Sequence, residues 1–107
     1  MATDPENAGQ AELELQPPTN FVSIRPERSG CGRYAFGSWD ILVNVHTTRR
    51  IRMSVRTEWN YHSTTLQSSE DYTLGPREEI NLGCDFWRPD LEPLQEFERT
   101  ITRAIYV

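Results

Sequence analysis

The residues best able to do chemistry in this chain are two cysteines and two histidines. Neither His46 nor His62 stands at a spacing from Cys31 or Cys84 that matches a common zinc or copper motif. The chain also lacks a G-x-S-x-G nucleophile motif and a glycine-rich phosphate-binding motif. The sequence therefore predicts no catalytic residues, no metal site and no cofactor, and we do not expect an enzyme.

The two cysteines leave two interpretations open. Cys31 stands between glycines, and Cys84 lies on the apolar side of a predicted strand. An even number of cysteines in a short β-rich chain permits one disulfide, whereas the alternative is two free thiols. A Cys31–Cys84 bond would indicate a protein that is secreted or delivered to another compartment, and its absence would favour the cytoplasm. No signal peptide is apparent, and no apolar run reaches the roughly 20 residues of a membrane-spanning helix.

Arginine supplies all 11 basic residues of the chain. Four of them form a local stripe: Arg49, Arg50, Arg52 and Arg56. The stripe is either a binding surface for an acidic partner protein or a set of ion pairs with carboxylates on neighbouring strands. Nucleic acid is not an expected partner, because the aromatic residues that would stack on bases fall on the opposite side of the strand.

Three aromatic residues stand at the ends of predicted strands: Trp59, Tyr61 and Trp87. Aromatic rings in such places either contact a sugar or close the ends of a small core, since each buries about 150–250 Å². A carbohydrate-binding module is therefore the alternative to a protein-binding one.

The elements that would position these residues begin with two alternating runs, Trp39–His46 and Arg50–Trp59. Alternate side chains of a strand point to opposite faces, so each run predicts a half-buried strand. We expect the two strands to pair as a hairpin through Thr47–Arg49. The predicted inward residues are Trp39, Ile41, Val43 and Val45 in the first strand, and Ile51, Met53, Val55, Thr57 and Trp59 in the second.

The rest of the chain predicts short strands separated by long connections. In order, we expect a strand at Phe21–Arg25 ended by Pro26, a loop or broken edge strand over 26–38, a long loop over Asn60–Ser69, a strand beginning at Tyr72, a turn at Gly75–Glu78, a strand over Ile80–Phe86, a short helical turn near 91–96 and a last strand from about Glu98.

Residues 1–20 contain four acidic residues and no basic one, which predicts a flexible acidic segment. Residues 21–107 then form a single domain. We expect an all-β fold: a small antiparallel β-sandwich of immunoglobulin-like size with five to seven strands.

The absence of a catalytic set predicts a non-enzymatic interaction module that binds another protein through a sheet face or an edge strand. Effector, immunity, inhibitor and structural-assembly roles all fit such a module. An edge strand that pairs with itself would make a homodimer.

Overall fold

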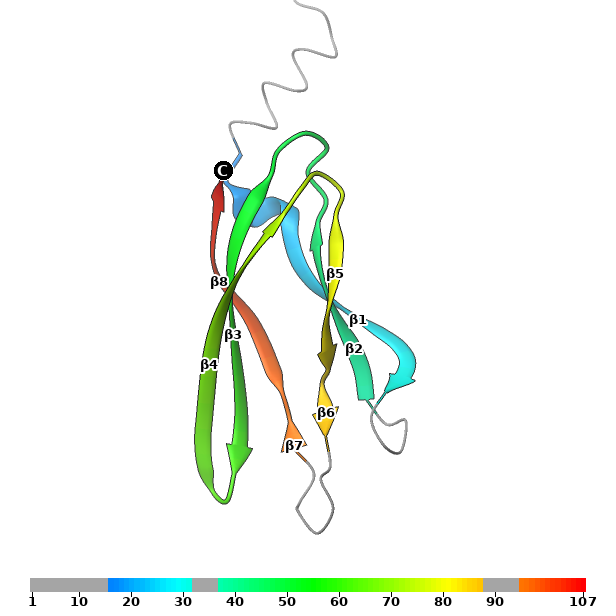
Figure 1. Cartoon of the computed structure of the whole chain (residues 1–107), viewed down its shortest axis with the longest axis vertical. Coiled ribbons are helices and arrows are strands. Elements are labelled where there is room, and N and C mark those ends of the chain that lie inside the picture. Colours follow the sequence, from blue (N-terminus) through cyan, green and yellow to red (C-terminus); the bar gives the residue numbers. More distant parts are fainter. Residues whose placement is uncertain (1–15, 32–36, 88–94) are drawn as a thin grey trace, which may run out of the picture.

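The computed structural model describes residues 16–31, 37–87 and 95–107. Strands form most of this part of the chain, and two three-stranded antiparallel sheets have the orders β1–β2–β5 and β4–β3–β8 (Figure 1). The elements are η1 (Pro18–Phe21), β1 (Val22–Cys31), β2 (Gly37–Asn44), β3 (Ile51–Tyr61), β4 (Thr64–Leu74), β5 (Glu79–Cys84), β6 (Phe86–Trp87), β7 (Gln95–Glu96) and β8 (Glu98–Tyr106). The predicted all-β antiparallel sandwich is confirmed. The only helix among the described residues is the four-residue η1, and no helix there has the length and hydrophobicity to cross a membrane.

The core of the sandwich lies between the two large sheets. Five fully or almost fully buried side chains form its centre: Leu42, Ile51, Met53, Val55 and Leu74. Three of them come from β3 at alternate positions, as its sequence predicts. The predicted inward side of this strand is therefore confirmed over Ile51–Val55.

The predicted pairing of the first two strands is wrong. β2 pairs with β1 and β5, whereas β3 pairs with β4 and β8, so residues 45–50 cross from one sheet to the other. Buried side chains hold this crossing in place. The ring nitrogen Nδ1 of His46 accepts hydrogen bonds from the backbone N–H groups of Thr48 and Arg49, at 3.1 and 3.0 Å. Side chains that bind nearby backbone in this way offer the chain an alternative to a tight hairpin.

The predicted inward side of the first run is right only in part: Ile41 is 5% exposed, as expected, but the pattern fails at the end of β2 and in the residues that follow it. Val45 is 57% exposed, whereas Leu42, Asn44 and His46 are at most 1% exposed. The side-chain amide of Asn44 donates to the backbone carbonyls of Arg49, Leu74 and Gly75 at 3.0–3.2 Å. Because a buried polar group is tolerated when it is hydrogen-bonded, the polar side of β2 faces inward near its end.

The predicted long loop over Asn60–Ser69 is also wrong, because it contains the end of β3 and the first half of β4. The two strands pair without a register shift from Tyr61↔Thr64 to Ile51↔Leu74. Only His62 and Ser63 connect them, both at positive φ (48° and 64°), as a type I′ hairpin turn requires. A long two-stranded arm results (Figure 1).

Other predicted elements agree with the structure in part. The turn at Gly75–Glu78 is confirmed by a 3.2 Å bond from the Glu78 N–H to the Gly75 carbonyl. The final strand is confirmed as β8. The first strand does not end at Pro26 but continues to Cys31 as an edge strand, where proline is tolerated.

Two predictions fall largely outside the described residues. Of the helical turn near 91–96, only Gln95–Glu96 is described, and it forms strand β7. Of the acidic segment 1–20, only residues 16–20 are described. Residues 18–20 belong to η1, and the Tyr106 hydroxyl donates to the Gln16 carbonyl at 2.7 Å.

Candidate functional site

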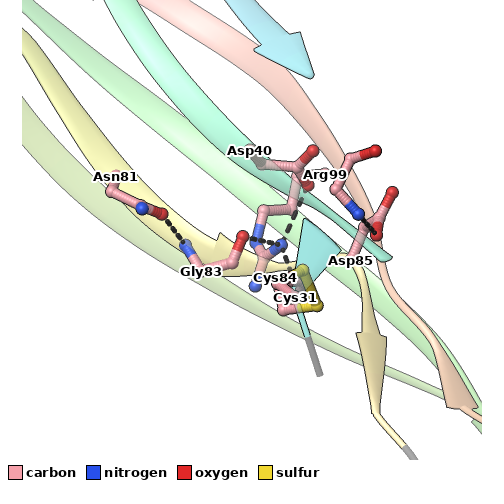
Figure 2. Close-up of a disulfide and its surroundings, with 8 residues drawn as sticks. Cys31, Asp40, Asn81, Gly83, Cys84, Asp85 and Arg99 are labelled. Carbon is pink, nitrogen blue, oxygen red and sulfur yellow. Dashed lines mark hydrogen bonds and ion pairs between the residues drawn. A yellow bond between two sulfur atoms is a disulfide. The ribbon is translucent and has the colours of Figure 1, made fainter. Parts of the chain in front are cut away.

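Cys31 and Cys84 form a disulfide, which decides between the two interpretations of the sequence. The bond joins β1 and β5, the two outer strands of one sheet (Figure 2). It lies against Gly37 of the central strand β2. A Cβ atom on Gly37 would lie 2.5 Å from the Cys84 sulfur and 2.8 Å from the Cys31 sulfur. Glycine is therefore required at this point of β2.

The only group of possible metal ligands among the described residues contains this same disulfide: Cys31, Cys84 and Asp85. Because the two sulfurs are bonded to each other, neither is a thiolate that could hold a metal. The Asp85 carboxylate accepts a 2.7 Å hydrogen bond from the backbone N–H of Ser38 on β2. The Asp85 carboxylate, directly after β5, therefore forms a hydrogen bond that links this end of β5 to β2.

A buried ion pair lies beside the disulfide. The Arg99 guanidinium, from β8, is 2.9 Å from the Asp40 carboxylate on β2, and each side chain is 12% exposed (Figure 2). Arg99 also donates to the Cys84 carbonyl at 3.2 Å. The Arg99 side chain thus ties one sheet to the other inside the sandwich.

Sequence reasoning missed Arg99 and Asp40. The available indication was an arginine in the alternating run Phe97, Arg99, Ile101, whose other members are apolar. Gly83 makes room for the guanidinium: its φ is 124°, and a Cβ there would lie 3.2 Å from an Arg99 nitrogen.

The predicted arginine stripe does not form one continuous surface. Arg49 packs its guanidinium 4.6 Å from the centre of the Tyr106 ring, and Arg56 pairs with Glu58 at 2.9 Å. Arg50 and Arg52 are exposed and make no ion pair with any described residue. The four arginines of the stripe therefore differ: Arg49 packs on an aromatic ring, Arg56 forms an ion pair, and Arg50 and Arg52 are exposed without an ion-pair partner among the described residues.

Arg52 shares a shallow hollow with a second arginine that the sequence did not single out. The hollow, on the outer face of the β4–β3–β8 sheet, has a volume of about 140 Å³ and is lined by Arg52, Ser54, Asp71, Arg103 and Ile105. Asp71 accepts a 2.6 Å hydrogen bond from the Ser54 hydroxyl. Two guanidinium groups and one carboxylate give this face a modest positive charge beside β4.

Two of the three predicted aromatic residues, Trp59 and Tyr61, lie at the far end of the β3–β4 arm, whereas Trp87 belongs to β6. Trp59 stands 5.9 Å, centre to centre, from the Phe97 ring and lines a cavity of about 410 Å³. The other lining residues are mostly polar: Glu58, Asn60, Thr65, Glu96 and Glu98. Tyr61 follows on the same side of β3 and is 40% exposed, whereas the side chain of Trp87 lies outside the described part of the chain.

The most exposed element is β4, an outer strand of its sheet. Each residue from Thr64 to Asp71 is exposed, whichever face of the sheet it lies on. On the inner side, the Tyr72 hydroxyl donates to the Glu70 carboxylate at 2.7 Å, and this bond raises the pKa of Tyr72. The strand contains no proline, and the charged side chains that can protect a free edge are confined to Glu70 and Asp71.

The three other outer strands are each interrupted or short. β1 contains Pro26 and a register shift between Glu27 and Cys31. β5 has six residues, and the pairing of β8 with β3 shifts at Ser54–Val55. Of the four outer strands described in the two large sheets, only the eleven-residue β4 pairs with its neighbour without a shift.

The turn geometry shows which backbone groups of β4 face outward. In a two-residue hairpin the flanking pair, here Tyr61 and Thr64, exchanges both hydrogen bonds. Alternation along the ladder then directs the even-numbered residues of β4 toward β3. The 3.1 Å bond from the Val107 N–H to the Arg50 carbonyl supports this assignment. It shows that the backbone groups of even-numbered residues at the start of β3 point toward the β8 side of the sheet, and therefore away from β4. The outward-facing N–H and C=O groups therefore belong to Thr65, Gln67, Ser69, Asp71 and Thr73.

No family model, no curated protein and no solved structure matches this chain.

Proposed function

We propose that this protein is a non-enzymatic interaction module that binds an extended segment of another polypeptide along the free edge of β4. The observation that carries the proposal is an eleven-residue outer strand, paired without a shift on one side and exposed on the other. Effector, immunity, inhibitor and structural-assembly roles all remain compatible with such a module.

Backbone chemistry supports this function. A free edge presents a row of unpaired N–H and C=O groups, which is a template for another strand. An added strand gains affinity from main-chain hydrogen bonds and specificity from alternate side chains. On the outer face of the sheet, Arg52 of β3 lies opposite Thr73 of β4 and would favour an acidic residue in the bound segment.

The test is a proline substitution that removes an outward N–H while keeping the β3–β4 ladder. We expect Gln67→Pro and Ser69→Pro to weaken binding of a peptide ligand at least about tenfold, close to the loss of one or two backbone hydrogen bonds. The ligand is selected from a displayed library of extended peptides, and its affinity is measured by fluorescence anisotropy.

Gln67→Ala and Ser69→Ala serve as matched controls, because they shorten the same side chains and keep the N–H groups. Amide hydrogen exchange locates the bound peptide: the amides of Gln67 and Ser69 should become protected, while those of Leu66 and Ser68 are already protected in the free protein. Peptide binding that survives both proline substitutions would show that β4 is not the binding site.

A second function, carbohydrate binding, is favoured by the cavity beside Trp59. An aromatic ring next to carboxylates and an amide is a common setting for sugar recognition. Under this alternative, Trp59→Ala should abolish glycan-array hits, with Tyr72→Phe as a control that keeps its ring outside this cavity. An array without hits, or hits that persist in Trp59→Ala, would exclude it.

A further inference from the structure

We propose that the polypeptide that pairs with β4 is a second copy of this chain, related by a two-fold axis at Ser69. This inference rests on the proposed function of the β4 edge and names its partner. Two β4 strands would then run antiparallel at the centre of a continuous six-stranded sheet. The strand order would be β8–β3–β4 followed by β4–β3–β8 of the second copy.

The length of the strand favours this position of the axis. Ser69 is the middle residue of β4, which runs from Thr64 to Leu74. An axis at Ser69 therefore uses the whole strand, whereas an axis nearer either end leaves part of both edges unpaired. The axis also sets odd-numbered residues opposite odd-numbered ones, so that the outward N–H and C=O groups of the two copies meet.

The side chains agree with the same register. On the inner face, Leu66 would lie opposite Tyr72 of the second copy, an aliphatic–aromatic pair. On the outer face, the Gln67 amide would lie opposite the Asp71 carboxylate of the second copy and can donate to it. Thr65 would lie opposite Thr73 of the second copy, and Ser69 opposite its own counterpart. Each of these pairs is of a kind that stabilises neighbouring strands.

Neighbouring registers are less favourable. An axis at Glu70 or at Asp71 sets like charges directly opposite each other. An axis at Ser68 sets Leu66 opposite a Glu70 carboxylate. Glu70 and Asp71 are the charged residues of β4. The axis at Ser69 places Glu70 opposite Ser68 and Asp71 opposite Gln67 of the second copy, so every carboxylate faces a neutral polar group.

The shape of the arm leaves room for the second copy. β3 continues to Tyr61, beyond its last pair with β8 at Glu58↔Glu98, so the tip of the arm extends past the rest of its sheet. β4 forms the outer side of this arm (Figure 1). Isologous contacts of this kind close on themselves and yield a dimer rather than a fibre.

The first experiment measures the mass of the full chain in solution by analytical ultracentrifugation over a concentration series. We expect a monomer–dimer equilibrium in the wild type and in Ser69→Ala, and a monomer in Ser69→Pro and Gln67→Pro. Circular dichroism confirms that each variant is folded. Two proline positions are used so that a folding defect at one does not decide the result.

The second experiment tests the register by oxidative cross-linking. Hydrogen-bonded antiparallel partners have Cα atoms about 5.5 Å apart, within disulfide range, so Ser69→Cys should form a covalent dimer. In Gln67→Cys the two introduced thiols would be offset by four residues, about 13 Å along the strand, and should not cross-link. Mass spectrometry separates the new bond from Cys31–Cys84.

The outcomes separate the partner from the function. A protein that is monomeric at every concentration overturns the second copy as partner. The peptide experiment then decides separately whether the edge of β4 binds another polypeptide. A dimer that persists in both proline variants overturns β4 as the interface. A covalent dimer of the Gln67→Cys variant, with none of the Ser69→Cys variant, overturns the register.

Discussion

Replacing Arg99 with methionine is expected to lower the free energy of unfolding by about 3–5 kcal/mol. The Asp40 carboxylate, which lies 2.9 Å from the guanidinium and is 12% exposed, would be left in the interior without a cation. The Cys84 carbonyl would lose its hydrogen bond from Arg99 as well. Urea denaturation followed by circular dichroism measures the change.

The double variant separates the charge from the packing. Arg99→Met combined with Asp40→Leu removes both charges, so it should recover much of the stability that the single substitution loses. Arg103→Met is the matched control: it lies on the same strand but is exposed, and we expect a change within about 0.5 kcal/mol. A cost of Arg99→Met no larger than that of Arg103→Met would contradict a stabilising role for the buried pair.

Alternation predicts a strand from the sequence when one side faces the core and the other faces water. β3 meets this condition over Ile51–Val55, and its inward side was predicted correctly. β2 meets it only in part, because its last residue, Asn44, is polar and yet fully buried, as is His46 in the crossing that follows. The Asn44 amide bonds to carbonyl groups of two distant residues, Leu74 and Gly75, which no local pattern reveals. His46 accepts hydrogen bonds from its neighbours Thr48 and Arg49.

The first half of β4, whose edge carries the proposed interaction, was missed for a related reason. β4 is exposed on both faces from Thr64 to Asp71, so no apolar side exists to produce alternation. Its threonines favour a strand, but the preference is weak without packing. The turn was equally hidden, since His62 and Ser63 adopt positive φ without the glycine or asparagine typical of such turns.

The disulfide and the buried pair show a second limit of local patterns. Two cysteines allowed a bond, but its contact with Gly37 depends on β2 lying between β1 and β5. The predicted hairpin placed β2 beside β3, an arrangement that gives Gly37 no special role. For the disulfide and the buried pair, strand order was therefore the missing information.

Gly37→Ala is the second large expected effect. The Cβ of alanine would stand within 3 Å of both sulfurs, so the disulfide and the centre of β2 cannot both keep their places. In the chain-entropy model, a bond between residues 53 positions apart stabilises the fold by about 4 kcal/mol. We therefore expect Gly37→Ala to lose several kcal/mol of unfolding free energy, up to about that amount, and to retain free thiols that a mass shift on alkylation detects.

The loss caused by the same substitution should shrink once the sulfurs are gone. In a Cys31→Ala, Cys84→Ala background the two sulfur contacts are absent and only the Asp85 Oδ1 contact, at 3.0 Å from the added Cβ, remains. This contact works against the usual advantage of alanine over glycine inside a strand, about 0.5–1 kcal/mol. Gly75→Ala is the control in the wild type, because the nearest atom to its added Cβ is 4.0 Å away. An equal loss for Gly37→Ala in both backgrounds would mean that the disulfide is not what requires glycine at this position.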